Sequence, residues 1–420
     1  MYMYMFSNDT AEDLAIKQKL LDNTVSIDLL IEFTDRKTKT LTSKNILLDT
    51  LELTNSICDD STLKFGGCIS SQLSISVFGV DDELNNREIK VYIYQKYIDE
   101  LYPSNTLYPK TEIVDSPASN LYPYKLVPVR ACIFAGIIDS SKRQQNRNVR
   151  EIIAYDKLYQ VSKINVYNWF YGVAYHSPKI TIKNLKETLV DILESNGITL
   201  DTSIYDSDDN YTLDLSYQLV EEICDRKLTA LELLESYCEI TAHFAYCTGN
   251  GTIKILRLPQ AGMELVPYEV KYYTDLTFED YTVASITNAR FPYNKSKTQN
   301  VQIKDVSATK EEKKNYYDSD NKLTAFNKTD TIISNLIRPN GSLLNGWLFY
   351  DFRPFNANLF GRWWLEPGDT ISLDTGADDI KKITTTIFSR TINGTAGLSV
   401  TASTTSSERQ GVEEKQWGTT

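Results

Sequence analysis

The side chains best suited to metal binding gather in one short stretch of the sequence. Cys238, His243 and Cys247 are ligands that tetrahedral zinc accepts, and Cys224 could supply a fourth. Their spacing matches no common zinc knuckle, Cys238 falls on the apolar face of a predicted helix, and Cys247 lies in a β-prone run. Buried structural cysteines explain the pattern better, so we predict no metal here and keep zinc as the alternative.

Only two histidines are available for acid–base catalysis, His176 and His243. A catalytic triad would have to use one of them beside a nucleophile. No Gly-x-Ser-x-Gly elbow occurs, and His176 lies in a turn-like Tyr-His-Ser-Pro sequence. Gly249-Asn250-Gly251 lacks the rest of a phosphate-binding or dinucleotide-binding motif. We therefore expect no catalytic residue, no cofactor and no enzymatic activity.

One acidic stretch resembles the start of a calcium-binding loop. Asp206, Asp208 and Asn210 alternate as the oxygen ligands of such a loop do. Tyr211 stands where that loop needs Gly, and Tyr217 stands where it needs a bidentate Glu. A solvated acidic turn is the better interpretation.

A locally basic stretch could contact nucleic acid or an acidic neighbouring subunit. It contains Lys142, Arg143, Arg147 and Arg150, interleaved with Gln and Asn. The formal net charge of the chain is −12, whereas duplex binding needs clustered Lys and Arg to neutralise phosphates. We interpret the stretch as an exposed loop between two strands and expect no sequence-specific binding of nucleic acid.

Trp363 and Trp364 could form part of a sugar-binding platform, because aromatic faces stack on sugars. Residues 349–365 are rich in aromatic and apolar side chains, so a core or a subunit interface is the better interpretation. Glycan binding stays as the alternative.

Length and composition limit the framework that carries these residues. The 420 residues suggest two or three domains, and the 27 tyrosines suit strands and interfaces. Six cysteines are too few and too irregular for a disulfide framework. The first ten residues lack the pattern of a signal peptide, and no long apolar run occurs, so we expect synthesis in a bacterial host cytoplasm and no membrane span.

The first part of the chain is predicted to be a β domain with a leading helix. Helix formers over residues 9–21 predict the helix. Apolar residues then alternate with other residues in segments 27–33, 73–77, 89–94 and 129–138, which is typical of half-buried strands. Short strands without amphipathic helices between them favour a sandwich or small barrel.

A smaller mixed domain is predicted at residues 161–265. Residues 184–196 have an apolar face and end before a glycine that suits a helix cap. Thr229 and Glu232 form a capping box at the start of a second helix. A Gly-Asn-Gly sequence between two β-prone runs predicts a hairpin over residues 244–256.

Strand patterns resume near residue 266. A polar excursion at residues 304–328 is predicted to be an exposed loop, and the Ser-, Thr- and Glu-rich residues 406–420 to be disordered in isolation. The predicted fold class is mainly β with an α+β insertion. It comprises two β-barrel domains, residues 1–160 and 266–405, and the smaller mixed domain.

Several stretches, taken in order, resemble the baseplate hub proteins of bacteriophage tails. Those similar to the N-terminal hub barrel are residues 63–68 with Phe65, Gly66 and Gly67, the strand 72–78 with the segment 89–91, residues 134–139 with Gly136, and residues 153–159. The helix and hairpin of residues 231–256 resemble the next module in phages of Gram-positive hosts. Pro367, Gly368 and Asp369 resemble a turn of a second hub barrel, although this tripeptide forms a turn in any family.

The resemblance implies a myophage-hub-like protein with two tube-type barrels per subunit. In that family a homotrimer makes a ring of six similar units around the channel for DNA ejection. The implied partners are the distal tail ring or tube protein, a spike or fibre, and the tape measure protein, all in the virion tail. Relatives that carry an enzyme continue into a longer C-terminal region, so the resemblance implies no activity here.

Two alternatives stay open. One is another tail subunit or a subunit of a contractile injection machine. The other is a cell-wall hydrolase or a glycan-binding tail protein.

Overall fold

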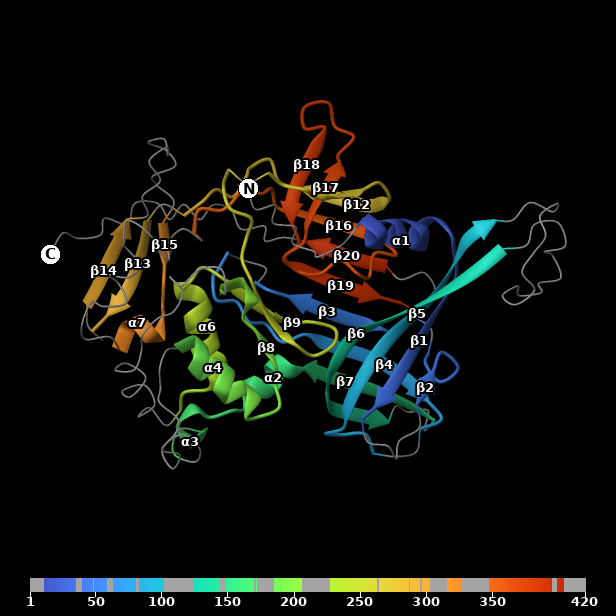
Figure 1. Ribbon diagram of the computed structural model, residues 1–420, viewed down its shortest axis with the longest axis horizontal. Coiled ribbons are helices and arrows are strands. Elements are labelled where there is room, and N and C mark those ends of the chain that lie inside the picture. The colour runs from blue at the N-terminus through green and yellow to red at the C-terminus, as the bar shows by residue number, and fades with distance from the viewer. Residues whose placement is uncertain are drawn as a thin grey trace.

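The fold is mainly β, as predicted, and is built on one large curled antiparallel sheet (Figure 1). Three smaller sheets and a few short helices accompany it. The computed structural model describes residues 11–34, 40–47, 49–58, 63–80, 83–101, 124–143, 148–169, 171, 185–205, 227–262, 264–286, 288–294, 297–302, 316–326, 347–394 and 399–403.

The large sheet has eleven strands from both halves of the chain. In spatial order they are β12 (Tyr273–Phe278), β16 (Phe355–Phe360), β20 (Ser399–Ser403), β19 (Ser389–Asn393), β3 (Glu52–Ser56), β4 (Gln72–Phe78), β7 (Val149–Asp156), β6 (Tyr124–Arg143), β5 (Glu88–Leu101), β1 (Thr24–Phe33) and β2 (Leu41–Thr42). The four strands predicted in the first domain are confirmed as β1, β4, β5 and β6.

Alternation with a period of two explains why these segments are strands. In β1, Leu29, Ile31 and Phe33 are buried, while the residues between them are more exposed. Successive side chains of a strand point to opposite faces, so one face of the sheet joins the core. The register continues this pattern into β5, where Val91 lies opposite Ile31 and is also buried.

The pairing of β3 with β19 joins the two ends of the chain. The strands are antiparallel, and Leu53 lies opposite Ile392, with both side chains fully buried. The strands assigned by sequence to the first and the last domain therefore belong to one continuous sheet. The pairing was not predicted, because Thr54 and Thr391, which meet there, are 337 positions apart.

Three smaller sheets lie beside the large one. The sheet β8 (Leu200–Asp201), β10 (Ile253–Leu256), β9 (Phe244–Cys247) contains the predicted hairpin, which the antiparallel pairing of β9 with β10 confirms. The other two are β11 (Tyr268–Val270), β17 (Thr370–Asp374), β18 (Lys382–Thr386) and β14 (Lys297–Gln302), β13 (Asn288–Tyr293), β15 (Tyr316–Asp318).

Capping residues mark the ends of the main helices. The three predicted helices are confirmed as α1 (Ala11–Asp22), α4 (Leu185–Glu194) and α6 (Ala230–Ile240). Gly197 follows α4 with a φ of +70°, and Thr229 and Glu232 form the predicted capping box of α6. The shorter helical segments are α2 (Lys157–Val161), α3 (Val166–Trp169), η2 (Ser203–Tyr205) and α7 (Lys322–Phe326). No helix among the described residues is long and apolar enough to cross a membrane.

The interpretation of the basic stretch as an exposed loop is wrong in part. Lys142 and Arg143 belong to β6, and Arg150 belongs to β7. Arg150 is buried, and its Nε donates a hydrogen bond to the backbone carbonyl of Val80 at 2.9 Å. A guanidinium group can be buried in this way when its donors find acceptors. Arg147 lies outside the described residues.

The prediction of an exposed loop at residues 304–328 is also wrong in part. The described portion contains β15 and α7, in which Tyr317 and Leu323 are buried. These two apolar contacts hold a mostly polar segment against the rest of the protein. The remainder of the excursion, like residues 406–420, lies outside the described residues.

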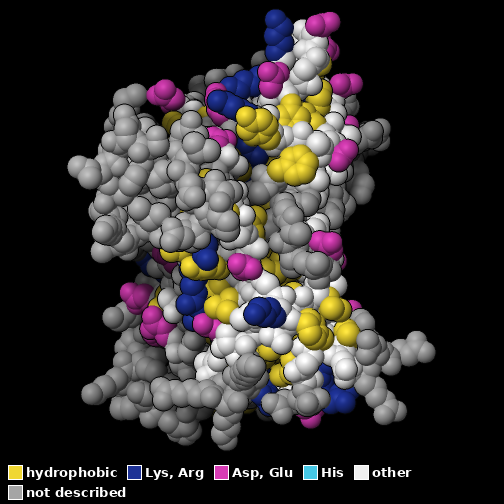
Figure 2. Space-filling model, turned by 90° about the vertical axis from the view of Figure 1, so that its right-hand side faces the viewer, with side chains coloured by type: hydrophobic (Ala, Val, Ile, Leu, Met, Phe, Trp, Pro, Cys, Tyr) yellow, Lys and Arg dark blue, Asp and Glu magenta, His cyan; other side chains and the backbone are white. Residues whose placement is uncertain are grey.

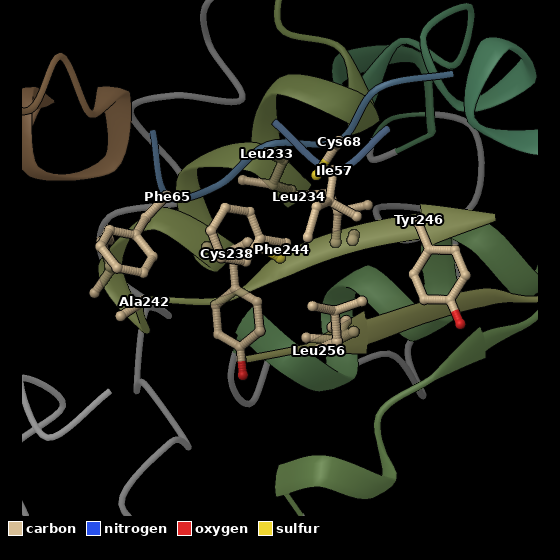
Figure 3. Packing of buried hydrophobic residues seen from close by; sticks show 14 of the residues in the cluster. Ile57, Phe65, Cys68, Leu233, Leu234, Cys238, Ala242, Phe244, Tyr246 and Leu256 are labelled. Atoms are coloured by element: carbon tan, nitrogen blue, oxygen red, sulfur yellow. The ribbon is translucent and has the colours of Figure 1, made fainter. Parts of the chain in front are cut away.

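The buried residues that the structure describes form two hydrophobic cores. One is formed mainly by strands of the large sheet. The other lies around α6 and includes Phe65 and Phe244, which come from distant parts of the chain (Figure 3). The Phe65 ring centroid lies 5.4 Å from that of Phe244 and 4.6 Å from that of Trp347. The loop before β4 is therefore fastened to the mixed α/β module that contains α6.

Candidate functional site

A pocket of about 330 Å³ lies between the loop of residues 64–69, helix α6 and the segment 320–322. The loop carries Phe65, Gly66 and Gly67, which the sequence singled out. The tertiary structure brings the three segments together, because they are far apart in the sequence.

Two glycines allow the loop to lie directly against its neighbours. Gly66 has a φ of +82°, and a Cβ atom there would lie 2.5 Å from the backbone oxygen of Glu235 in α6. A Cβ atom on Gly67 would lie 2.0 Å from the backbone oxygen of Ile57. Both positions therefore require glycine for close approach. The amide of Gly66 also donates to the carbonyl of His243 at 2.8 Å.

Helix α6 supplies the polar wall of the pocket. Glu232, Glu235, Ser236 and Glu239 line the pocket at spacings of three and four residues, which places them on one helix face. Lys322 forms an ion pair with Glu232, and Lys64 forms one with Asp320 at 3.2 Å between Nζ and Oδ1.

Glu239 is the most deeply buried carboxylate of the pocket. Its Oε1 accepts a hydrogen bond from the Tyr317 hydroxyl at 2.9 Å, and its Oε2 accepts one from Asn321 Nδ2 at 2.8 Å. Burial raises the pKa of Glu239, although these hydrogen bonds oppose the rise. A hydrogen-bonded buried carboxylate of this kind anchors the segment 317–321 to α6.

Glu235 has different surroundings. Its carboxyl group makes no hydrogen bond or close ion pair with any residue that the structure describes. Burial first, and the negative charge of Glu232 second, raise the pKa of Glu235 to about 7, while Lys64 and Lys322 oppose the rise. Such a carboxyl can exchange a proton near neutral pH and, when ionised, attracts a cation.

A second buried polar group lies where the large sheet meets the turn of residues 366–369. Arg390 donates from Nε to Asn55 Oδ1 at 3.0 Å and from Nη1 to the carbonyl oxygens of Trp363, at 2.8 Å, and Leu365. Arg390 thus links β19, β3 and the segment before β17. The rigid fork of the guanidinium group suits this set of acceptors.

The predicted Pro367-Gly368-Asp369 turn contacts this region. Gly368 has a φ of +96°, and its amide donates to the carbonyl of Ile387 at 2.7 Å. Asp369 Oδ2 accepts a hydrogen bond from the amide of Glu366 at 2.8 Å. Burial, with a contribution from the charge of Glu366, raises the pKa of Asp369 to about 7.

Trp363 and Trp364 do not form a flat platform. Their rings meet nearly edge to face at 81°, and Trp363 is buried with its Nε1 donating to Gln95 Oε1 at 2.7 Å. A sugar stacks on an exposed aromatic face, which Trp363 lacks. Trp363 belongs to the core formed by the large sheet.

The possible zinc ligands are core residues around α6. Cys238 and His243 are fully buried, and Cys247 is nearly so. Burial raises the pKa of the Cys247 thiol, whereas a metal-binding thiol must lose its proton. Burial and the charge of Arg257 lower the pKa of His243 to about 3, so the imidazole is neutral. Among the described residues no group of three or more His, Cys, Asp or Glu side chains is arranged to hold a metal.

Of the remaining residues that the sequence singled out, Gly136 is described by the structure. Gly136 lies in β6, where a Cβ atom would be 2.1 Å from the backbone oxygen of Tyr155 in β7. His176, Cys224 and the calcium-like stretch 206–210 lie outside the described residues.

Sequence reasoning missed Glu235, Ser236, Glu239 and Arg390. The three polar residues of α6 recur at helical spacing after the capping box, which is a usable signal for a polar helix face. Arg390 carries no such signal, because its acceptors come from distant segments.

On the face of the molecule in Figure 2, the described acidic and basic side chains are interspersed with hydrophobic ones.

No model of a known protein family and no curated protein matches the chain. Solved structures similar to it include the 43 kDa tail protein of prophage MuSo2 from Shewanella oneidensis. The two sequences are 9% identical, the match covers 90% of this chain and 98% of that chain, and the TM-score is 0.48. A tail protein from Neisseria meningitidis MC58 has 8% identity, coverage of 90% and 97%, and a TM-score of 0.47. A chain of the phage P2 baseplate in its activated conformation has 8% identity, coverage of 92% and 100%, and a TM-score of 0.27.

Proposed function

We propose that this chain is a non-enzymatic structural subunit of a bacteriophage tail baseplate, and specifically its hub. In this proposal three copies form a ring that lines the DNA channel. The ring connects the distal tail ring or tube protein with the central spike or fibre and the tape measure protein.

One observation carries the proposal: the stretches that resemble hub proteins meet one another in space. Gly66 and Gly67 lie against α6 and Ile57, and Gly136 lies against β7. A Cβ atom on Gly249, in the hairpin turn, would lie 2.3 Å from the backbone oxygen of Cys132 in β6. Gly368 lies against Leu256 at the end of the same hairpin. Glycine at each junction lets these segments pack as one framework.

The continuous sheet supports a structural role. The sheet contains strands from both halves of the chain, so a mechanical force applied to either half would be transmitted through backbone hydrogen bonds. β12 lies at one edge of the large sheet, and an edge strand can pair with a strand of a neighbouring subunit.

The test is the oligomeric state and shape of the purified protein. We expect mass photometry to give a threefold mass and negative-stain electron microscopy to show rings with a central channel, if necessary after addition of the adjoining tail ring protein. Compact monomers that form no ring with that partner would contradict the proposal. Turnover of peptidoglycan, abolished by substitution of one Asp or Glu, would favour a hydrolase instead.

A further inference from the structure

The pocket beside α6 is lined mostly by charged and polar residues, which is typical of a binding pocket and not of a gap in an apolar core. We refer to it as the socket. It is bounded by a glycine loop that cannot be enlarged without a clash and by a helix face held by a capping box. The exposed ion pairs Glu232–Lys322 and Lys64–Asp320 lie among its lining residues.

Two polar groups on this helix face have no partner within the described part of the chain. Ser236 is 6% exposed, and its hydroxyl makes no hydrogen bond there, although its backbone oxygen accepts one from Asn321. The Glu235 carboxyl, one residue away, is likewise without a hydrogen bond. The Ser236 hydroxyl and the partly exposed Glu235 carboxyl both line the pocket, so both can accept hydrogen bonds from a donor that enters it.

The charge balance defines the donor. Glu232, Glu235, Glu239 and Asp320 bring four carboxyl groups to the pocket, against Lys64 and Lys322. Glu232 and Asp320 each have a lysine partner, and Glu239 has Tyr317 and Asn321. Of these four carboxyl groups, Glu235 therefore has no close partner among the described residues and can pair with one further cation.

We infer that this pocket receives the side chain of a lysine or arginine on a neighbouring protein of the assembly, with Glu235 as its counter-ion and Ser236 as a further hydrogen-bond acceptor. The inference rests on the proposed role as an assembly subunit. A guanidinium group fits best, because its several N–H donors can reach both acceptors at once.

The first experiment uses the whole protein and two probes of the same shape. Nα-acetylarginine amide carries the positive charge, and Nα-acetylcitrulline amide does not. At pH 8, titration calorimetry should show the arginine probe binding about 10- to 100-fold more tightly, as expected for a charge-assisted hydrogen bond. Equal binding of both probes, or binding of neither at their highest soluble concentrations, would overturn the inference.

Variants locate the binding. Glu235→Gln should weaken the arginine probe by about 10-fold or more, and Ser236→Ala should weaken it to a smaller extent. Glu194→Gln removes the same charge from an exposed position of α4 and should change nothing. Circular dichroism of each variant checks folding. Unchanged binding by folded Glu235→Gln would place the probe elsewhere and refute the inference.

The pH dependence of probe binding tests the role of Glu235 independently of the variants. The titratable groups around Glu235 are Glu232 and Glu239 on its own helix, Lys64 and Cys68 on the loop, and Asp320 and Lys322 on the third segment. Because the pKa of Glu235 is about 7, its ionised fraction falls from about 90% at pH 8 to about 10% at pH 6, and affinity for the arginine probe should fall about 10-fold. Affinity that does not fall would contradict the role of Glu235.

The outcome is separable from that of the hub proposal. If the protein forms rings but does not bind the arginine probe, the inference about the pocket is refuted and the hub proposal stands. Probe binding by a protein that forms no ring would remove the hub and leave the socket.

Discussion

Glu235 and Asp369 share a pKa near 7 for the same physical reason in two different settings. Burial is the main cause in each, and a neighbouring carboxyl group adds to it, Glu232 in one case and Glu366 in the other. Glu235 lines an open pocket, whereas Asp369 lies inside a turn and accepts a backbone hydrogen bond. The first arrangement suits binding, and the second ties stability to pH.

Asp369→Asn should make the protein less sensitive to pH. The folded-state pKa of about 7 lies above the ordinary value of 3.8, so stability from this group is fully present below pH 3.8 and is lost as pH rises through 7. The variant keeps an oxygen acceptor for the amide of Glu366 and cannot ionise. We expect its free energy of unfolding in urea to exceed that of the wild type by about 3–4 kcal/mol at pH 8 and to differ by less than about 1 kcal/mol at pH 4.

Asp378→Asn is the matched control, because Asp378 is exposed in the turn between β17 and β18. It should leave the free energy of unfolding unchanged at both pH values. A lower stability of Asp369→Asn than of the wild type at pH 8 would contradict the assignment of Asp369 as a destabilising charge.

At the scale of elements, α6 depends on its N-terminal cap. The Thr229 hydroxyl accepts a hydrogen bond from the Glu232 amide at 3.2 Å, and Glu232 Oε2 accepts one from the Thr229 amide at 2.9 Å. Glu232 also pairs with Lys322, so the cap links the helix to the third wall of the pocket.

Thr229→Ala should lower the free energy of unfolding by about 1 kcal/mol, because the Glu232 amide loses its acceptor, the Thr229 hydroxyl. Chemical denaturation at pH 7 measures the change. Thr229→Ser keeps the hydroxyl and should stay within about 0.5 kcal/mol of the wild type. Equal losses for Ala and Ser would mean that packing of the Thr methyl group, rather than capping, is responsible.

The loop before β4 depends on Gly67. Gly67→Ala should destabilise the protein by about 2–4 kcal/mol, because the new methyl group meets the backbone of Ile57 rather than a movable side chain. Gly262→Ala tests backbone conformation alone, since Gly262 has a φ of +79° and open space around its Cβ position. We expect it to cost about 1 kcal/mol in thermal or urea unfolding. A cost at Gly67 no larger than at Gly262 would contradict the close packing.

At the scale of the whole molecule, the β3–β19 pairing makes both ends of the chain one cooperative sheet. Ile392→Ala should cost about 2–4 kcal/mol, because a fully buried side chain leaves a cavity at this seam. Amide hydrogen exchange should become faster in β4 and in β16 alike, since each lies two strands from β19 in the sheet order.

Val266→Ala serves as the control for this change, because Val266 is 53% exposed. It should alter the free energy of unfolding by less than about 0.5 kcal/mol. Faster exchange confined to β19 and β20 in the Ile392→Ala protein would show that the two halves open independently.

Local chemistry made much of the secondary structure predictable. Alternating apolar residues predicted β1, and Thr229 with Glu232 predicted the start of α6. Both signals act between near neighbours in the sequence. The mainly β class followed from such signals. The predictions for residues 142–150 and 304–328 were wrong in part, because buried contacts of Arg150 and Tyr317 outweigh the polar composition around them.

The sequence by itself determined elements such as β1, α6 and the β9–β10 hairpin, since those choices depend on residues a few positions apart. Tertiary structure alone decided that β3 pairs with β19 and that Lys64, Glu235 and Asp320 surround one pocket. Pairing and burial are collective, because each depends on the space that all other side chains leave. The pKa of Glu235 belongs to this second group, as it arises from burial and from charges on three separate segments.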